Sequence, residues 1–167
     1  MWRWIAGLAA IPAGAAALVC GIGLLLPRNH VAMAEAVIPA PPAAVAARIR
    51  DVAAYPGWRS GVERIEGLER DGNGTRFVEH SDNGAIAFLL TEEVRDARFK
   101  SLITDPRLPF GGYWTITLAP EGAGTRVRIE EHGSVGNPVY RFFSALIFGH
   151  DRTMKAYLAD FARAVGR

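Results

Sequence analysis

The chain has 167 residues, of which 50% are hydrophobic and 22% are charged, and this composition excludes a disordered or fibrous protein. Its 19 basic and 17 acidic residues nearly balance, so we expect no nucleic-acid partner. The length suits one globular domain. The single cysteine, Cys20, excludes a disulfide within the chain and a zinc site built from cysteines.

The amino-terminal segment is far more apolar than the rest of the chain. About 20 of the first 27 residues are hydrophobic, and residues 4–26 form an uncharged stretch of 23 residues. As a helix this stretch would span about 35 Å, which is enough to cross a bilayer. Trp2 and Trp4 stand at one end and Arg28 at the other, where aromatic rings and a cation suit the headgroup region. The segment therefore predicts one transmembrane helix, with the bilayer as a partner through residues 4–26.

Two other interpretations of this segment stay open. The tripeptide Ala32-Met33-Ala34 has the form of a signal-peptidase site, although the apolar core exceeds the usual length of about 7 to 15 residues. A buried helix of a soluble protein is the other alternative. Arg3 and Arg28 flank the stretch with similar charge. For a retained single-pass anchor we expect the amino terminus inside and the domain on the outer, periplasmic or extracellular, side.

The rest of the chain predicts one α+β domain, residues 31–167, after an anchor and short linker in residues 1–30. Residues 31–38 read as a first strand that ends before Pro39, and residues 42–53 read as a helix with Pro42 in its first turn. Turn sequences such as DGNG and EGAG then separate β-rich runs, which predicts an antiparallel meander. Its strands are expected near residues 62–70, 75–81, 85–95, 98–104, 113–119 and 125–134.

The last segment predicts a long amphipathic helix that begins at Asn137-Pro138. Apolar residues recur at helical spacing from Val139 to Val165. Such an apolar stripe needs a partner surface about as long as itself, and only the meander offers one. We therefore expect this helix to cover the concave face of the sheet.

Three passages of the chain resemble the START/Bet v1-like superfamily, also described as polyketide cyclase/dehydrase and lipid transport proteins. They are VIPAPPAAVAARIRDVAAYPGW, LPFGGYWTITLAPEGAGTRVRIEEHG and FGHDRTMKAYLADF, and the resemblance covers residues 31–166. It implies a helix-grip fold, in which a seven-stranded antiparallel sheet curls around the carboxy-terminal helix and leaves an apolar cavity. Members transport lipids, bind hydrophobic small molecules, or cyclise and dehydrate polyketides, so the resemblance implies a pocket and leaves the reaction open.

Two titratable residues are the strongest candidates for a site in that cavity. On the last helix, His150 falls on the apolar stripe between Phe143 and Met154. On the strand TRVRIEEHG, the parity of the inward valine and isoleucine turns Glu131 inward as well. Each also has a plain structural interpretation. His150 would be a core histidine with one hydrogen-bond partner, and Glu131 would be solvated where its strand frays or bulges.

Other residues are weaker candidates. Trp58 and Trp114 are more often core residues than ligand contacts, and Arg107 is more readily a solvated loop residue than a ligand contact. Glu79 and His80 close a strand whose parity is ambiguous. The residues expected to contact a ligand are His150, Glu131, Trp114, Phe88, Phe143, Met154, Trp58 and Arg107. The four histidines show no metal-ligand spacing, so we expect no metal and no cofactor.

These features favour a membrane-tethered binding module for a hydrophobic small molecule, such as a lipid, a quinone or a polyketide-like compound. A tether suits an apolar ligand, because it holds the pocket close to the bilayer in which the ligand concentrates. The alternative is a polyketide cyclase/dehydratase in which His150 and Glu131 exchange protons, although no nucleophile motif supports it. A domain that binds another protein is a third hypothesis.

Overall fold

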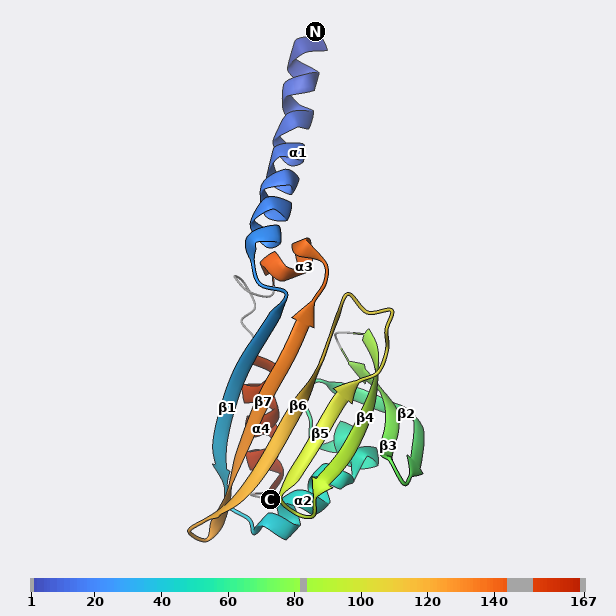
Figure 1. The fold of residues 1–167 in the computed structure, drawn as a ribbon, viewed down its shortest axis with the longest axis vertical. Helices are drawn as coiled ribbons and strands as arrows, with labels where there is room; N and C mark the ends of the chain where they lie inside the picture. The colour runs from blue at the N-terminus through green and yellow to red at the C-terminus, as the bar shows by residue number, and fades with distance from the viewer. Residues whose placement is uncertain (1, 82–83, 144–151, 166–167) are drawn as a thin grey trace.

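The computed structural model describes residues 2–81, 84–143 and 152–165, and the side chains from residue 14 onward. A long amino-terminal helix leads into an α+β domain (Figure 1). The helices are α1 (Trp2–Leu25), α2 (Pro42–Arg50), the 3-10 helix η1 (Val52–Gly57), α3 (Pro138–Phe143) and α4 (Arg152–Val165). The strands are β1 (Asn29–Ile38), β2 (Val62–Asp71), β3 (Gly74–Ser81), β4 (Gly84–Val94), β5 (Arg98–Ile103), β6 (Phe110–Glu121) and β7 (Gly124–Val135).

The seven strands form one antiparallel sheet in the order β1-β7-β6-β5-β4-β3-β2. β1 and β7 pair in unbroken register, from Asn29 opposite Ser134 to Ile38 opposite Thr125. Figure 1 shows the sheet curling around α4, which lies behind β1, β7 and β6 and contacts β1. The predicted α+β helix-grip fold, with a seven-stranded antiparallel sheet and a carboxy-terminal helix, is confirmed.

Alternation along the strands decides which side chains face the core. In β7, Val127 and Ile129 are fully buried, whereas Arg126 and Arg128, which alternate with them, are exposed. β-Branched residues suit an extended backbone, so the same residues favour the strand and fill the core. The residues of α4 that face the sheet recur at helical spacing and are buried against it. They are Met154, Tyr157, Leu158 and Phe161.

One buried carboxylate fastens α4 to the segment that precedes β2. Asp160 of α4 is 4% exposed and accepts hydrogen bonds from the backbone N–H of Ser60 at 2.8 Å and from its hydroxyl at 2.9 Å. Arg163 donates to the other oxygen of the same carboxylate. These bonds satisfy a charge that would otherwise be costly to bury, and they position α4 against the domain.

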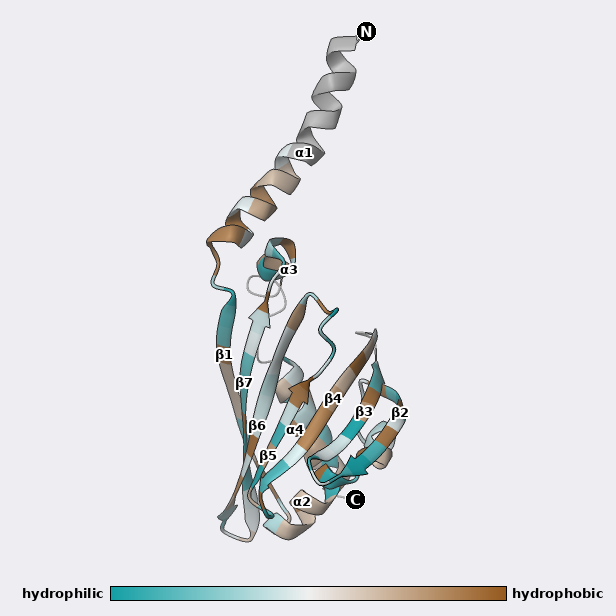
Figure 2. Cartoon of the chain, turned by 45° about the vertical axis from the view of Figure 1, so that its right-hand side comes forward, coloured by the Kyte–Doolittle hydropathy of each residue, from teal (hydrophilic) through white to brown (hydrophobic). Residues whose placement is uncertain are grey.

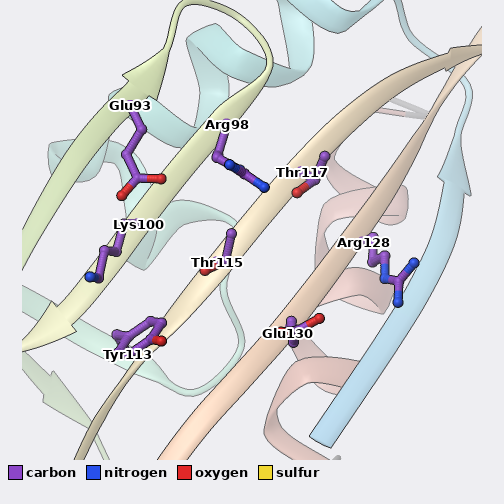
Figure 3. A pocket seen from close by; sticks show the side chains of 8 residues that line it. All are labelled: Glu93, Arg98, Lys100, Tyr113, Thr115, Thr117, Arg128 and Glu130. Atoms are coloured by element: carbon purple, nitrogen blue, oxygen red, sulfur yellow. The ribbon is translucent and has the colours of Figure 1, made fainter. Parts of the chain in front are cut away.

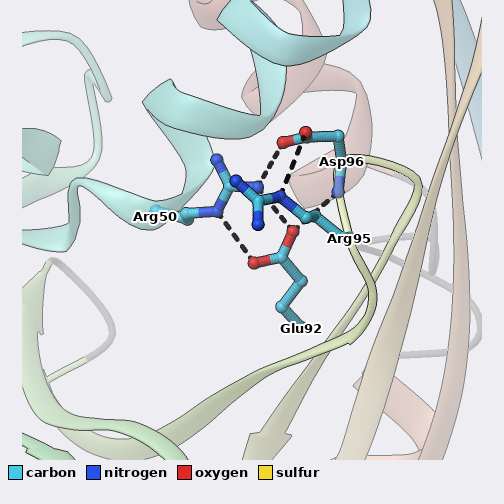
Figure 4. A network of polar contacts seen from close by, with 4 residues as sticks. All are labelled: Arg50, Glu92, Arg95 and Asp96. Atoms are coloured by element: carbon cyan, nitrogen blue, oxygen red, sulfur yellow. Dashed lines mark hydrogen bonds and ion pairs between the residues drawn. The ribbon is translucent and has the colours of Figure 1, made fainter.

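A polar network fastens the end of α2 to the β4–β5 turn (Figure 4). Arg50 donates to Glu92 through Nε at 2.8 Å and through Nη2 at 2.5 Å, and it also donates to Asp96. The Glu92 carboxylate accepts the backbone N–H of Asp96 at 2.7 Å. The hydrogen bond from Arg50 lowers the pKa of Glu92 below its ordinary value of 4.5.

Two predicted helices differ from the observed ones. α2 ends at Arg50, because Asp51 leaves helical geometry (φ −82°, ψ 68°) and the chain continues as η1. The expected carboxy-terminal helix is described as α3 and α4, and α3 lies beside the end of α1 instead of across the sheet (Figure 1). The prediction that the carboxy-terminal helix covers the sheet along its whole length is therefore wrong for residues 138–143.

α1 continues to Leu25, close to the end of the predicted apolar stretch. Within the residues that the structure describes, no helix meets both the length and the hydropathy needed to cross a membrane. The predicted anchor stays a prediction.

Candidate functional site

Glu131 points to the concave face of the sheet and binds two donors there. β7 keeps its register with β6 through this position, with Trp114 directly opposite, so the strand neither frays nor bulges before it. The indole N–H of Trp114 donates to Oε2 at 2.6 Å, and Nε2 of His30 lies 2.9 Å from Oε1. An ionised carboxylate only accepts, so a charged Glu131 would accept this bond from Nε2 of His30. The inward orientation predicted for Glu131 is confirmed.

His30 is a residue that the sequence analysis missed. β1 begins at Asn29, two residues earlier than predicted, and the parity of the buried Ala34 and Ile38 turns His30 inward. Gly133 lies opposite it on β7, and a Cβ on that glycine would overlap the imidazole ring. The glycine therefore makes the room in which the histidine ring lies.

A buried ion pair lies on the same face. Nη2 of Arg59 donates to Oε1 of Glu79 at 3.1 Å, and Nη1 donates to the other carboxylate oxygen. The Arg59 guanidinium carbon also lies 4.9 Å from the ring centroid of Tyr55 and 5.2 Å from that of Tyr157, as in a cation–π contact. The sequence left open whether Glu79 or His80 of β3 faces inward. Because Phe77 is buried, the alternation along the strand turns Glu79 inward as well. His80 lies on the outer side, where it pairs with Glu66.

Tyr157 of α4 connects the two polar groups. Its ring centroid lies 5.3 Å from that of Trp58 and 5.9 Å from that of Trp114, both in edge-to-face geometry. Burial raises the pKa of the Tyr157 phenol, which therefore stays protonated at neutral pH. Among the described residues, neither its hydroxyl nor Nε1 of Trp58 has a hydrogen-bond partner, although both atoms are buried.

These side chains form one connected set, which we call the concave-face cluster. Its members are His30, Trp58, Arg59, Glu79, Trp114, Glu131 and Tyr157. The cluster combines aromatic surface with two carboxylates and two unpaired polar atoms, so it suits an apolar molecule that carries a few polar groups. The contact between Glu131 and His30 also joins two groups that can exchange a proton.

The other predicted ligand residues fall into two groups. Phe88 stacks on Phe77 at 5.5 Å between centroids, and Met154 is fully buried in the core, so both lie on the concave side. Phe143 does not, because it is partly exposed on α3 and its ring packs on Phe142.

Arg107 also lies apart from the cluster. It is on the β5–β6 loop, where its exposed guanidinium donates to Asp105 at 2.9 and 3.0 Å and lowers the pKa of that carboxyl to about 2. This geometry supports the solvated-loop interpretation. His150 lies outside the described residues.

Two hollows lie elsewhere on the domain. One, of about 550 Å³, is on the outer face of the sheet and is lined by charged and polar side chains such as Lys100, Thr115 and Arg128 (Figure 3). These residues alternate with Trp114 and Ile129 along their strands, so this hollow is separated from the concave-face cluster by the sheet. The other, of about 620 Å³, lies beside α2. In the described ranges, no group of histidine, cysteine, aspartate and glutamate residues could hold a metal ion.

The chain matches solved structures of one fold. A START superfamily protein from Mycobacterium smegmatis superposes with a TM-score of 0.65 at 12% identity, over 82% of this chain and 97% of the other. Norcoclaurine synthase from Thalictrum flavum gives 0.65 at 15% identity, over 83% and 87%. The di-domain ARO/CYC StfQ of the steffimycin biosynthetic pathway gives 0.66 at 10% identity, over 83% and 51%.

These identities show a shared fold and leave the activity of this chain open. No curated protein matches the chain in sequence. Residues 30–166, however, match one protein family along nearly the whole domain. With this match and the helix-grip fold, the chain belongs to the polyketide cyclase/dehydrase and lipid transport family.

Proposed function

We propose that the chain is a membrane-tethered module that binds a hydrophobic small molecule, such as a lipid, a quinone or a polyketide-like compound, in front of the concave-face cluster. Residues 1–30 would be the tether and residues 31–167 the binding domain. The description of the family includes lipid transport, and its fold is shared by a START superfamily protein and by the di-domain ARO/CYC StfQ. Both activities require an apolar molecule to reach the concave face.

The observation that carries this proposal is the pair of buried polar atoms, Nε1 of Trp58 and the hydroxyl of Tyr157, that have no partner among the described residues. Leaving a buried donor without a partner costs about 1 to 3 kcal/mol. A ligand with oxygen atoms would supply the missing acceptors, and the surrounding rings would supply apolar contact.

The tether rests on the sequence of residues 4–26 and on their helical backbone in α1. An uncharged helix of this length fits the hydrocarbon core of a bilayer, which is about 30 Å thick. The linker to β1 is only a few residues long, so the domain would stay at the membrane surface. We place it on the outer side, as the sequence analysis expects.

Native mass spectrometry of the full chain in detergent, after incubation with a membrane lipid extract, tests the binding function. We expect an adduct of an apolar compound. Incubation with ubiquinone and with a naphthol as separate probes extends the test to the other ligand classes. Absence of an adduct with all three would contradict the proposal.

A second candidate function is cyclisation or dehydration of a polyketide-like substrate, and the contact of Glu131 with His30 favours it. Two enzymes, norcoclaurine synthase and StfQ, share the fold. In this alternative the Glu131–His30 pair would move a proton at the bound substrate. Turnover of an aromatic polyketide by the wild type, lost in Glu131→Gln, would support the enzyme, and binding without turnover would support the binding module.

A further inference from the structure

The end of α1 and the short helix α3 are packed tightly together. The two helices are in contact, and Gly23 of α1 is buried against Pro138 of α3. A Cβ built on Gly23 would overlap the backbone carbonyl of Pro138. This position therefore accepts only glycine while α3 keeps its place.

Two hydrogen bonds beside this contact hold the segment that follows α1 to α3 and to the end of β7. Arg141 of α3 is 5% exposed, and its Nη1 donates to the carbonyl oxygen of Leu26 at 2.9 Å. The carbonyl of Arg28 accepts the backbone N–H of Val135 at 2.8 Å. The last carbonyls of a helix lack intrahelical partners and carry partial negative charge, so a buried arginine suits this end of α1. α1 is thus docked on the domain and is not a free tether.

Apolar side chains are exposed around this junction. Of the ten large hydrophobic residues that are exposed in the described part of the chain, five lie on α1 or α3. Leu25 is 87% exposed and Tyr140 is 53% exposed. Figure 2 shows the end of α1 that adjoins the domain in the colour of hydrophobic residues. The five are Leu18, Leu24, Leu25, Tyr140 and Phe143.

The two sequence segments that form the junction carry charges of one sign. The sequence contains no aspartate or glutamate in residues 1–34 or in residues 132–150, whereas Arg28 and Arg141 lie at the junction itself. A surface with exposed leucine and aromatic side chains, bordered by the exposed Arg28, is complementary to the headgroup layer of a bilayer that contains anionic lipids.

We propose that α3 is an interfacial helix, which lies in the headgroup layer beside the point where α1 leaves the bilayer. This inference rests on the tether of the proposed function. Because α3 is held at the depth of the last turn of α1, Tyr140 and Phe143 reach the same level as Leu24 and Leu25. The domain is then held in one orientation, with its α3 end against the lipid.

This orientation has a consequence for the ligand. His30 is the second residue of β1 and follows α1 by only a few residues, so its contact with Glu131 lies at the membrane end of the concave face. A molecule that leaves the bilayer beside α3 meets this polar pair before the rest of the concave-face cluster.

The test uses the full chain with Cys20→Ser, reconstituted in vesicles of phosphatidylcholine and phosphatidylglycerol. Tyr140→Cys labelled with an NBD fluorophore reports on α3. The matched control is Ala123→Cys, which is exposed on the β6–β7 hairpin at the opposite end of the domain (Figure 1). We expect nitroxide-labelled lipids to quench most of the emission at position 140 and little at position 123. A soluble quencher should act in the opposite order.

The possible failures are distinguishable. If the chain stays with the vesicles after an alkaline carbonate wash and position 140 is quenched no more than position 123, the interfacial position of α3 is wrong and the tether stands. If the wash releases the chain, the tether is wrong and the inference fails with it. Adding Gly23→Ala to the Tyr140→Cys variant should displace α3 and reduce the quenching by lipid. Unchanged quenching would show that the packing of Gly23 does not set the depth of α3.

Discussion

Trp114 and Glu131 are direct cross-strand partners on β6 and β7, and the indole N–H of the first donates to the carboxylate of the second at 2.6 Å. A carboxylate at this position would be costly to bury without such donors. The tryptophan therefore acts both as apolar surface towards Tyr157 and as the group that makes an inward glutamate possible.

Trp114→Phe tests this relationship. The substitution keeps an aromatic ring and removes the N–H, so Oε2 of Glu131 loses its donor. We expect the free energy of unfolding to fall by about 1 to 3 kcal/mol. Urea unfolding of the full chain in detergent measures the change.

The matched control is the double variant Trp114→Phe/Glu131→Leu, in which both polar partners are gone. It should lose less stability than the sum of the two single variants, because neither group is then left unpaired. Additive losses would show that the two side chains do not depend on each other.

Tyr157→Phe separates binding from folding. The hydroxyl is buried and has no partner among the described residues, so its removal should leave the unfolding free energy unchanged or raise it by up to about 1 to 3 kcal/mol. Ligand occupancy should fall, because the variant lacks the phenol that would meet a polar atom of the ligand. Thermal unfolding and native mass spectrometry of the same sample give both values. A large loss of stability with unchanged occupancy would assign the hydroxyl a structural role instead.

The Arg50–Glu92 pair should make stability depend on pH in the acid range. The hydrogen bond from Arg50 lowers the pKa of Glu92 in the folded state below its ordinary value of 4.5. The stabilisation is therefore fully present above the unfolded pKa and is lost as the pH falls through the folded one. Glu92→Gln should melt below the wild type at pH 7, and the difference in Tm should be smaller at a second pH well below 4.5. An equal difference in Tm at both pH values would contradict this assignment.

Membrane attachment and its orientation are tested on the full chain. If α1 is retained as an anchor, the protein should remain in the pellet after carbonate extraction. A product in the supernatant that lacks residues 1–34 would support the signal-peptide interpretation. Reporter fusions after Arg167 should be active outside the cytoplasm, and activity only within the cytoplasm would reverse the predicted orientation.

The strands were predictable because two local signals coincide in them. Turn sequences mark their ends, and the alternation of apolar residues marks their inner face, as in the run that contains Val127 and Ile129. The inward orientation of Glu131 follows from the same alternation, since a strand has a period of two residues.

The missed features depend on contacts between distant parts of the chain. His30 lies beyond the predicted start of β1 and meets Glu131 only because the first and last strands pair. The parity of Glu79 was ambiguous until its pairing with Arg59 was known. The packing of α3 on α1 depends on the space above Gly23, which no pattern within either segment reveals.

The central claim is that a hydrophobic molecule binds in front of the concave-face cluster. Its most direct test is native mass spectrometry of three full-length proteins with the same lipid extract: the wild type, the variant Trp58→Phe/Tyr157→Phe, and Lys100→Ala, which alters only the outer face. We predict an apolar adduct on the wild type and on Lys100→Ala, and its loss from the double variant. An adduct that persists in the double variant and disappears in Lys100→Ala would contradict the claim.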